Sequence, residues 1–209
     1  PPMPISPKRL IQSHRLSSTL RWSCYGWREV RGDGNCYYRA IYFSIMERII
    51  GHQQFASETL SYLYDKFKEV ENIFLTTYDT QIEDYRQLME DLGEQRHMFK
   101  SVMNFEEYLI INPGIEIAYV CIMKSIMGRV LMQGTSVPPE QLEVIRQSYG
   151  YTDEDTGTLW LKKIWLDHIA PLGLEADGPF VQLSTIPTFL GFGCELISLS
   201  RDGAKVLHN

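Results

Sequence analysis

The chain has 209 residues, of which 44% are hydrophobic and 12% aromatic, enough to bury the core of one domain. Its formal net charge of −6 and its sequence pI of about 5.4 argue against a nucleic-acid-binding surface. Its four scattered cysteines form no Cys-x-x-Cys pair and have no histidine at metal-ligand spacing, which argues against a zinc site or a disulfide scaffold and fits a reducing compartment.

The N-terminal region carries weak structural signals. Residues 1–20 are expected to form an arm, proline-rich at its start, in which residues 8–20 fit either a short helix or an irregular segment. Three aromatic residues that follow, Trp22, Tyr25 and Trp27, are interpreted as core packing rather than as a cofactor site. We find neither a signal-peptide core nor an uninterrupted run of about 18 apolar residues, so no membrane-spanning segment is expected.

The next stretch has the composition of a nucleophile loop. Residues 32–35, Gly-Asp-Gly-Asn, favour a tight turn with positive φ, followed by a helix that opens around Cys36. Unpaired backbone N–H groups and the helix dipole then favour the thiolate form of Cys36. The amides of Gly34, Asn35 and Cys36 could hold an oxyanion. The alternative is that Cys36 is a small, inert residue on a buried helix.

Helical periodicity dominates the middle of the chain. It predicts helices over residues 36–50, 55–74, 82–92, 99–111, 114–132, 138–149 and 158–169. The first is expected to be the central core helix, ended by Gly51, and the second an amphipathic helix with a solvated charged face. The helix after Asn112-Pro113 contains Cys121, which we interpret as structural. Residues from about 55 to 150 are expected to form a helical lobe beside the catalytic core.

Strand signals come late in the sequence. Residues 194–199 and 204–207 alternate loosely around an Arg-Asp-Gly turn and predict a β-hairpin. A two-stranded hairpin is marginal by itself in water, so it is expected to join further strands or to pack on helices.

Two stretches together resemble a known family. Residues 32–44, GDGNCYYRAIYFS, resemble the nucleophile motif of ovarian-tumour (OTU) cysteine proteases, with the otubain branch as the closest fit. Residues 175–183, then a helix and the strand 194–199, resemble the segment near the C-terminal end of otubains.

The resemblance implies a single papain-like OTU domain over residues 1–209. Its class would be α+β, helix-rich, with a small late β-sheet and an extended helical lobe that contacts ubiquitin. Cys36 would be the nucleophile, and Asp33 would shape the oxyanion loop that contains Gly34 and Asn35. Ubiquitin or polyubiquitin would be the partner, and no metal or organic cofactor is needed.

A histidine base is also implied, but the sequence departs from the family pattern here. The resemblance places the base after the late strands in a Gly-His-Tyr-Asp-like motif, which this sequence lacks. His208 lies in roughly the right place, and we favour a base beyond Asn209 over it. The remaining histidines are expected at the surface or near a helix end: His14, His52, His97 and His168.

Two functional hypotheses follow. The first is a deubiquitinase, an isopeptidase that forms an acyl-enzyme on Cys36. The second is a ubiquitin-binding module, or a truncated inactive relative without the histidine base. The family occurs in eukaryotes and among effectors of intracellular bacteria, so the expected compartment is the cytosol, that of the host for an effector. Linkage preference and oligomeric state do not follow from the sequence.

Overall fold

The computed structural model describes residues 8–9, 26–27, 30, 33–133, 143, 146–147, 149–151, 159–172, 185–193, 196–200 and 203–207. In the four strands the description covers the backbone alone. The predicted arm over residues 1–20 therefore lies outside the described residues, except for Lys8 and Arg9. These two residues form a strand rather than the start of the predicted helix.

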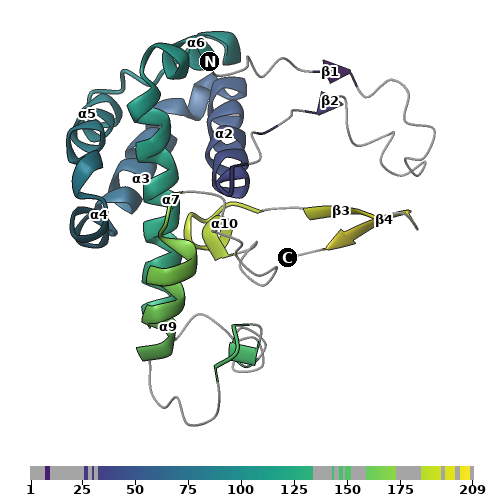
Figure 1. Cartoon of the computed structure of the whole chain (residues 1–209). Helices are drawn as coiled ribbons and strands as arrows, with labels where there is room; N and C mark the ends of the chain where they lie inside the picture. The colour runs from purple at the N-terminus through teal and green to yellow at the C-terminus, as the bar shows by residue number, and fades with distance from the viewer. Residues whose placement is uncertain are drawn as a thin grey trace.

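The long helix α7, Pro113–Gln133, is the centre of the molecule (Figure 1). Fourteen of its 21 residues are buried. It packs against α2, α4, α5, α6, α9 and α10, which explains why its apolar residues occur on all sides rather than on one stripe. The helix begins at Pro113, as the Asn112-Pro113 signal predicts. Cys121 is fully buried in it, which confirms the structural interpretation of this cysteine.

Helix α2, Cys36–Gly51, carries the predicted nucleophile at its first position. Half of its residues are buried, among them Tyr42, Met46 and Ile49, and it packs against α7, α3 and α6. The expected core helix is confirmed, but the interpretation of α2 as the central helix is wrong, because α7 has that place. Gly51 is still helical, and the cap is His52, whose N–H donates to the carbonyls of Arg48 and Ile49.

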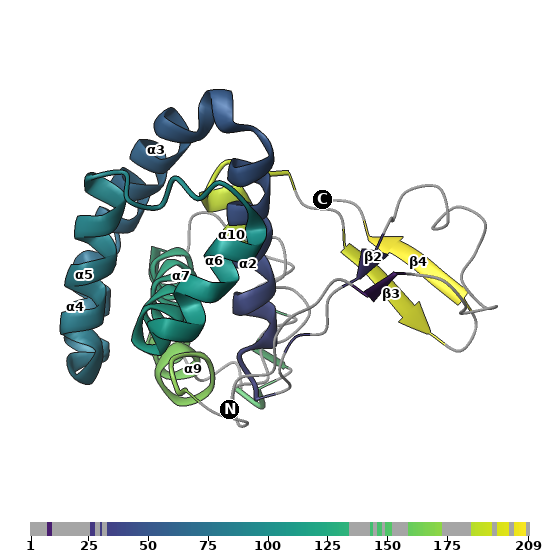
Figure 2. The same cartoon turned by 90° about the horizontal axis from the view of Figure 1, so that it is seen from above.

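The other helices cover α7 on several sides, as Figures 1 and 2 show. Their bounds are α3, Ala56–Lys68; α4, Glu71–Thr77; α5, Ile82–Gly93; α6, Val102–Ile111; α9, Leu159–Ile164; and α10, Thr185–Phe189. Short 3-10 turns occur at Gln53–Phe55 (η1) and Asp79–Gln81 (η2), and a π-helical segment, η3, covers Trp165–Ile169. Most of the predicted helix over 138–149 lies outside the described residues.

The predicted helix over 55–74 is interrupted. Val70 has φ −108° and ψ 4°, so the chain leaves the helical conformation between α3 and α4. Both Val70 and Phe74 are completely buried after this turn, and α4 packs against α7. Burial of these two side chains therefore outweighs the local preference for one continuous helix.

The backbone of α7 at Gly128 lies close to the Trp165 ring of η3. A Cβ atom on Gly128 would lie 2.4 Å from Cε2 and Nε1 of the Trp165 ring, so only glycine fits at this position. The Trp165 indole also donates to the carbonyl oxygen of Lys124 at 3.3 Å. The late segment that contains η3 is thereby held tightly on the central helix.

The expected α+β class is wrong for the part of the chain whose side chains are described, which is 79% helical and has no strand. The strands form two separate antiparallel pairs, β1 (Lys8–Arg9) with β2 (Gly26–Trp27), and β3 (Leu196–Ser200) with β4 (Gly203–Leu207). The predicted late hairpin is confirmed, with Leu196 opposite Leu207. No further described strand pairs with this hairpin, and Figures 1 and 2 both place it to one side of the helices. The core is therefore built by helices packed on α7.

Among the described residues, no single helix has the length and hydropathy needed to cross a membrane. The helices α6 and α7 satisfy that criterion only as a pair, and they are bent by 103° relative to each other.

Candidate active site

Cys36 is the first residue of α2 and is exposed. The helix starts with the bond from the N–H of Arg39 to the carbonyl oxygen of Asn35 at 3.1 Å. Gly34, two residues before Cys36, has φ +79°, a left-handed conformation that favours glycine. The tight turn predicted from the sequence is confirmed, and it leaves the thiol at the exposed end of a largely buried helix.

The side chain of Asp33 stabilises this turn. Its Oδ1 accepts the N–H of Asn35 at 3.1 Å, as an aspartate does in an Asx-turn. The same oxygen forms an ion pair with Nη1 of Arg39. The loop before Cys36 is thereby joined to the first turn of α2.

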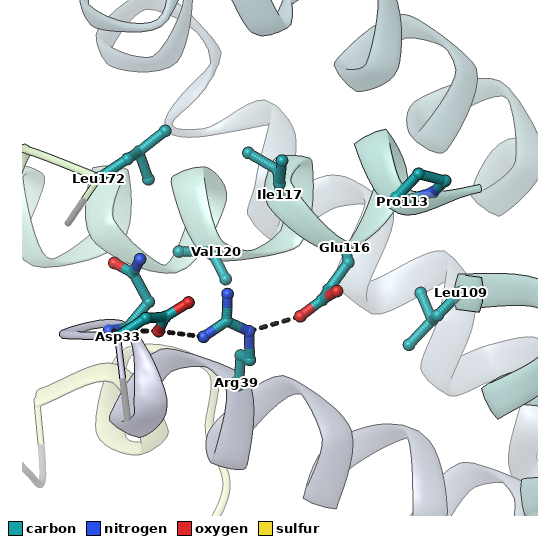
Figure 3. A pocket seen from close by; sticks show the side chains of 9 residues that line it. Asp33, Arg39, Leu109, Pro113, Glu116, Ile117, Val120 and Leu172 are labelled. Atoms are coloured by element: carbon teal, nitrogen blue, oxygen red, sulfur yellow. Dashed lines mark hydrogen bonds and ion pairs between the residues drawn. The ribbon is translucent and has the colours of Figure 1, made fainter. Parts of the chain in front are cut away.

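Arg39 also reaches the central helix. Its Nε donates to Oε1 of Glu116 on α7, so one guanidinium bridges two carboxylates that lie 83 residues apart in the sequence, as Figure 3 shows. Burial alone would lower the pKa of Arg39, but its hydrogen bonds to Asp33 and Glu116 outweigh burial and raise the pKa. Arg39 therefore stays charged and fixes the loop relative to α7.

Neither Arg39 nor Glu116 was singled out from the sequence. The available signal for Arg39 was a charged residue among the apolar residues of the first turns of α2, one turn after Cys36. Glu116 lies in the first turn of a helix, where an acidic residue is favourable for local reasons alone. Nothing in the sequence pairs these two residues.

A buried lysine lies beneath the nucleophile helix. Lys124 of α7 is completely buried, and its Nζ donates to the carbonyl oxygens of Ile169 at 2.7 Å and Pro171 at 2.6 Å. The same ammonium lies 4.8 Å from the ring centroid of Tyr38, two residues after Cys36. Burial lowers the pKa of Lys124 to about 8. Lys124 thus connects α7, the first turns of α2 and the end of η3.

No described histidine is hydrogen-bonded to Cys36. His97 is completely buried, so its expected place at the surface is wrong; it is hydrogen-bonded to the hydroxyls of Tyr119 at 2.7 Å and Tyr108 at 3.3 Å. His52 is exposed, as expected. The ring of His168 packs at a tilt of 34° against that of Tyr149, with ring centroids 4.7 Å apart. His14 and His208 lie outside the described residues.

A cavity of about 290 Å³ adjoins the nucleophile loop (Figure 3). Its polar side is formed by Asp33, Asn35, Arg39 and Glu116, and its apolar side by Leu109, Pro113, Ile117, Val120 and Leu172. Cys36 does not line it. Within the described ranges, no cluster of three or more His, Cys, Asp or Glu side chains could hold a metal ion.

These features define a class of protein. An exposed cysteine at the start of a largely buried helix, after a tight turn with Gly34 at positive φ, is an arrangement that suits the nucleophile of a cysteine hydrolase. The comparison with protein families agrees, because the model of Peptidase C65 Otubain matches residues 12–120, just over half of the chain.

The chain therefore belongs to the otubain family of cysteine peptidases, which are of the deubiquitinase type. The match includes the loop, Arg39 and Glu116. Neither the curated proteins nor the solved structures contain a significant match to this chain.

Proposed function

We propose that this chain is a deubiquitinating peptidase that cleaves isopeptide bonds through a thioester on Cys36. The family supports ubiquitin as the substrate and a thiol as the nucleophile. The observation that carries the assignment is the exposed position of Cys36 at the start of α2, behind a turn that Asp33, Arg39 and Glu116 hold together.

In the proposed reaction the Cys36 thiolate attacks the carbonyl carbon that joins the ubiquitin C-terminus to a lysine. A C–S bond forms, and the carbonyl electron pair moves to oxygen, giving a tetrahedral oxyanion. The C–N bond then breaks as the lysine amine takes up a proton. Water attacks the thioester, which releases the ubiquitin carboxylate and regenerates the thiol.

The loop geometry narrows the choice of oxyanion donors. The N–H of Asn35 already donates to Asp33 Oδ1 at 3.1 Å, so its role in the proposal is to hold the turn. We assign the oxyanion to the N–H of Cys36, with the N–H of Gly34 as the second donor. Asp33 is then a positioning residue, because its contacts are to Asn35 and Arg39.

Proton transfer in this mechanism requires a base. His208, the less favoured of the two candidates from the sequence, is untested for this role because it lies outside the described residues. The contact of the helical region 55–150 with ubiquitin also stays a prediction. Substitution of His208 by alanine tests the first point: a base at this position predicts loss of chain cleavage with retention of ubiquitin binding.

The direct test uses ubiquitin with a thiol-reactive group at its C-terminus, followed by intact-mass measurement and peptide mapping. We expect one adduct, on Cys36, and none with Cys36→Ala. Cys121→Ala is the matched control, because this cysteine is buried and burial raises its pKa to about 12. Adducts on another cysteine with Cys36 unmodified would contradict the assignment. Labelling of Cys36 without cleavage of ubiquitin chains would favour the binding module instead.

A further inference from the structure

The start of α2 lacks the local contacts that usually fix the N-terminus of a helix. Its N-cap, Asn35, forms no side-chain hydrogen bond to the helix, and no acidic residue lies in the first turn. A side-chain cap and an acidic first turn are what normally stabilise this end of a helix. The position of Cys36, the first residue of α2, therefore depends on contacts with other parts of the fold.

Two buried side chains near the start of α2 provide such contacts. Arg39 forms ion pairs with Asp33 and with Glu116 on α7 (Figure 3). Tyr38 is 3% exposed, and its ring centroid lies 4.8 Å from the Nζ atom of Lys124, also on α7. An ammonium group is attracted to the face of an aromatic ring, and more strongly where both are removed from water. Lys124 thus holds the first turn of α2 to the central helix through the ring of Tyr38.

The ammonium of Lys124 is itself held in place. Its side chain is completely buried, and its Nζ donates to the carbonyl oxygens of Ile169 at 2.7 Å and Pro171 at 2.6 Å. The carbonyl between them, that of Ala170, accepts the hydroxyl of Tyr78 at 3.1 Å. The last carbonyls of a helix lack partners within the helix, and a cation is favourable at this end. The end of η3 therefore fixes the ammonium, which makes Lys124 a rigid support rather than a mobile side chain.

The contact of Lys124 with Tyr38 depends on the positive charge, whereas the contacts with η3 depend on it less. A neutral amine keeps two N–H groups, enough for both carbonyl oxygens. It loses the charge that attracts the aromatic ring. Removal of the proton therefore weakens the hold on α2 in particular.

We propose that Lys124 is a positioning residue for Cys36: its buried ammonium holds the ring of Tyr38, and through it the first turn of α2, in the place that the reaction requires. Lys124 does not touch the substrate, because its side chain is completely buried. Its effect therefore falls on the maximal rate of reaction at Cys36 and not on the binding of ubiquitin. That Cys36 is the nucleophile rests on the proposed function, whereas the hold on α2 rests on the contacts of Lys124.

Lys124 titrates within the pH range in which activity can be measured. Burial lowers its pKa to about 8; Cys121 and Asp33 oppose this shift, and Arg39 adds to it. The ammonium is thus nearly complete at pH 7, and about a tenth of it remains at pH 9. The hold on α2 is present below this pKa and is lost as the pH rises through it.

The groups around Lys124 do not follow the same titration. The charged and titratable residues on the surrounding elements include Asp33, Tyr38, Arg39, Tyr78, Asp84, Cys121 and His168. Burial raises the pKa of Tyr38, Tyr78 and Cys121, which therefore stay protonated near pH 8. Arg39 keeps its charge.

The test compares the labelling of Cys36 by the thiol-reactive ubiquitin in the wild type and in Lys124→Met. We expect the maximal labelling rate to fall about tenfold at pH 7, with the half-saturating concentration of the probe within about twofold of the wild type. Leu88→Ala is the control, because Leu88 is completely buried on α5, and it is expected to lower Tm without slowing labelling. Equal maximal rates in the wild type and Lys124→Met would overturn the proposal.

The pH profile separates the charge of Lys124 from the packing of its side chain. The ratio of the wild-type rate to the Lys124→Met rate cancels every ionisation that the two proteins share. We expect this ratio to fall from about tenfold at pH 7 to about twofold at pH 9, over the range in which the ¹³Cε signal of Lys124 titrates in NMR. A ratio that stays constant while that signal titrates would also overturn the proposal.

A double-mutant cycle tests whether Lys124 acts through Tyr38. Tyr38→Leu removes the ring, keeps Lys124, and is expected to slow labelling about tenfold by itself. Adding Lys124→Met to Tyr38→Leu is expected to change the rate by less than about twofold, because the contact is already absent. In Tyr38→Phe, which keeps the ring, Lys124→Met is expected to have its full effect. A tenfold effect of Lys124→Met without the ring would show that it does not act through Tyr38.

Hydrogen exchange of the Arg39 amide, which donates to the carbonyl of Asn35, follows the first turn of α2 without ubiquitin. An amide so close to a helix end exchanges by local fraying, so the loss of stability in Leu88→Ala is expected to leave its exchange unchanged. We expect at least fivefold faster exchange in Lys124→Met and in Tyr38→Leu. This response without any labelling of the wild type would reject the proposed function alone. Wild-type labelling by Lys124→Met, with unchanged exchange, would reject the positioning role alone.

Discussion

Asp33 contacts both an uncharged and a charged partner, and the two contacts have different consequences for substitution. The N–H of Asn35 requires only an acceptor oxygen, while the ion pair with Arg39 requires the negative charge. Arg39 keeps a second carboxylate, Glu116, whatever replaces Asp33. The shape of the loop therefore depends more on the acceptor than on the charge.

We accordingly expect Asp33→Asn to lower kcat/KM for ubiquitin chains by no more than about tenfold, or about 1.4 kcal/mol. Asp33→Ala removes the acceptor as well and is expected to lower it further. Steady-state cleavage of ubiquitin chains measures both. A thousandfold loss in Asp33→Asn, with unchanged ubiquitin affinity and Tm, would show that the charge acts in catalysis.

Gly34 is the second position in the loop with a clear physical requirement. Its φ of +79° is strained for a β-branched residue, by about 1–3 kcal/mol, so Gly34→Val is expected to shift the loop amides. We expect cleavage to fall at least tenfold with little change in the far-UV circular dichroism spectrum. Gly51→Val is the control, because Gly51 ends the same helix, has no positive φ, and has no atom within 4 Å of an added Cβ. Wild-type cleavage by Gly34→Val would remove the amides of this loop from the mechanism.

At the level of elements, Lys124 joins the end of η3 to the central helix. The carbonyl oxygens of Ile169 and Pro171 both accept from its ammonium, and the hydroxyl of Tyr78 donates to the next carbonyl, that of Ala170, at 3.1 Å. Leu172, which lines the cavity, follows directly. This part of the cavity wall is therefore placed by hydrogen bonds from α7 and from the end of α4.

Lys124→Met tests this connection. The substitution relieves the cost of burying a charge, but it leaves two carbonyls without their donor, and each unsatisfied buried acceptor costs about 1–3 kcal/mol. We expect a net loss of about 2 kcal/mol in the free energy of unfolding, measured by urea denaturation. Lys162→Met, at an exposed position on α9, is expected to change stability by less than about 0.5 kcal/mol. Equal stability of the two variants would mean that other contacts hold η3.

At the level of the whole molecule, His97 makes stability depend on pH. It lies between α5 and α6, with Tyr119 and Tyr108 as hydrogen-bond partners and Asp91 Oδ2 3.8 Å from its Nε2. Burial lowers its pKa from 6.5 to about 4; the charge of Asp91 opposes this shift and that of Arg96 adds to it. The folded protein thus holds the imidazole neutral at pH values where the unfolded chain binds a proton.

The contribution of His97 to stability is therefore complete above pH 6.5 and is lost as the pH falls from 6.5 to about 4. The shift corresponds to at most about 3 kcal/mol. Urea denaturation at several pH values measures it: His97→Gln is expected to be less stable at pH 7 but to lose less stability between pH 6.5 and 4 than the wild type. His52→Gln, at an exposed site, is expected to keep the wild-type slope. The same slope in all three proteins would contradict a buried neutral His97.

The sequence by itself determined what depends on neighbours along the chain. The turn at Gly34, the start of α2 at Cys36, the start of α7 at Pro113 and the late hairpin follow from local backbone preferences and from periodicity, and the structure agrees. Local signals also sufficed for the family, because its nucleophile motif is one continuous stretch within the matched residues 12–120.

Only the tertiary structure decided which residues far apart in the chain meet. The bridge from Asp33 through Arg39 to Glu116, the burial of His97 and Lys124, and the break between α3 and α4 depend on which surfaces pack on α7. A helical pattern shows which face is apolar, but not which helix will cover it. For that reason the sequence predicted α2 as the central helix. In the structure α7 is central, because six other helices pack against it and 14 of its 21 residues are buried.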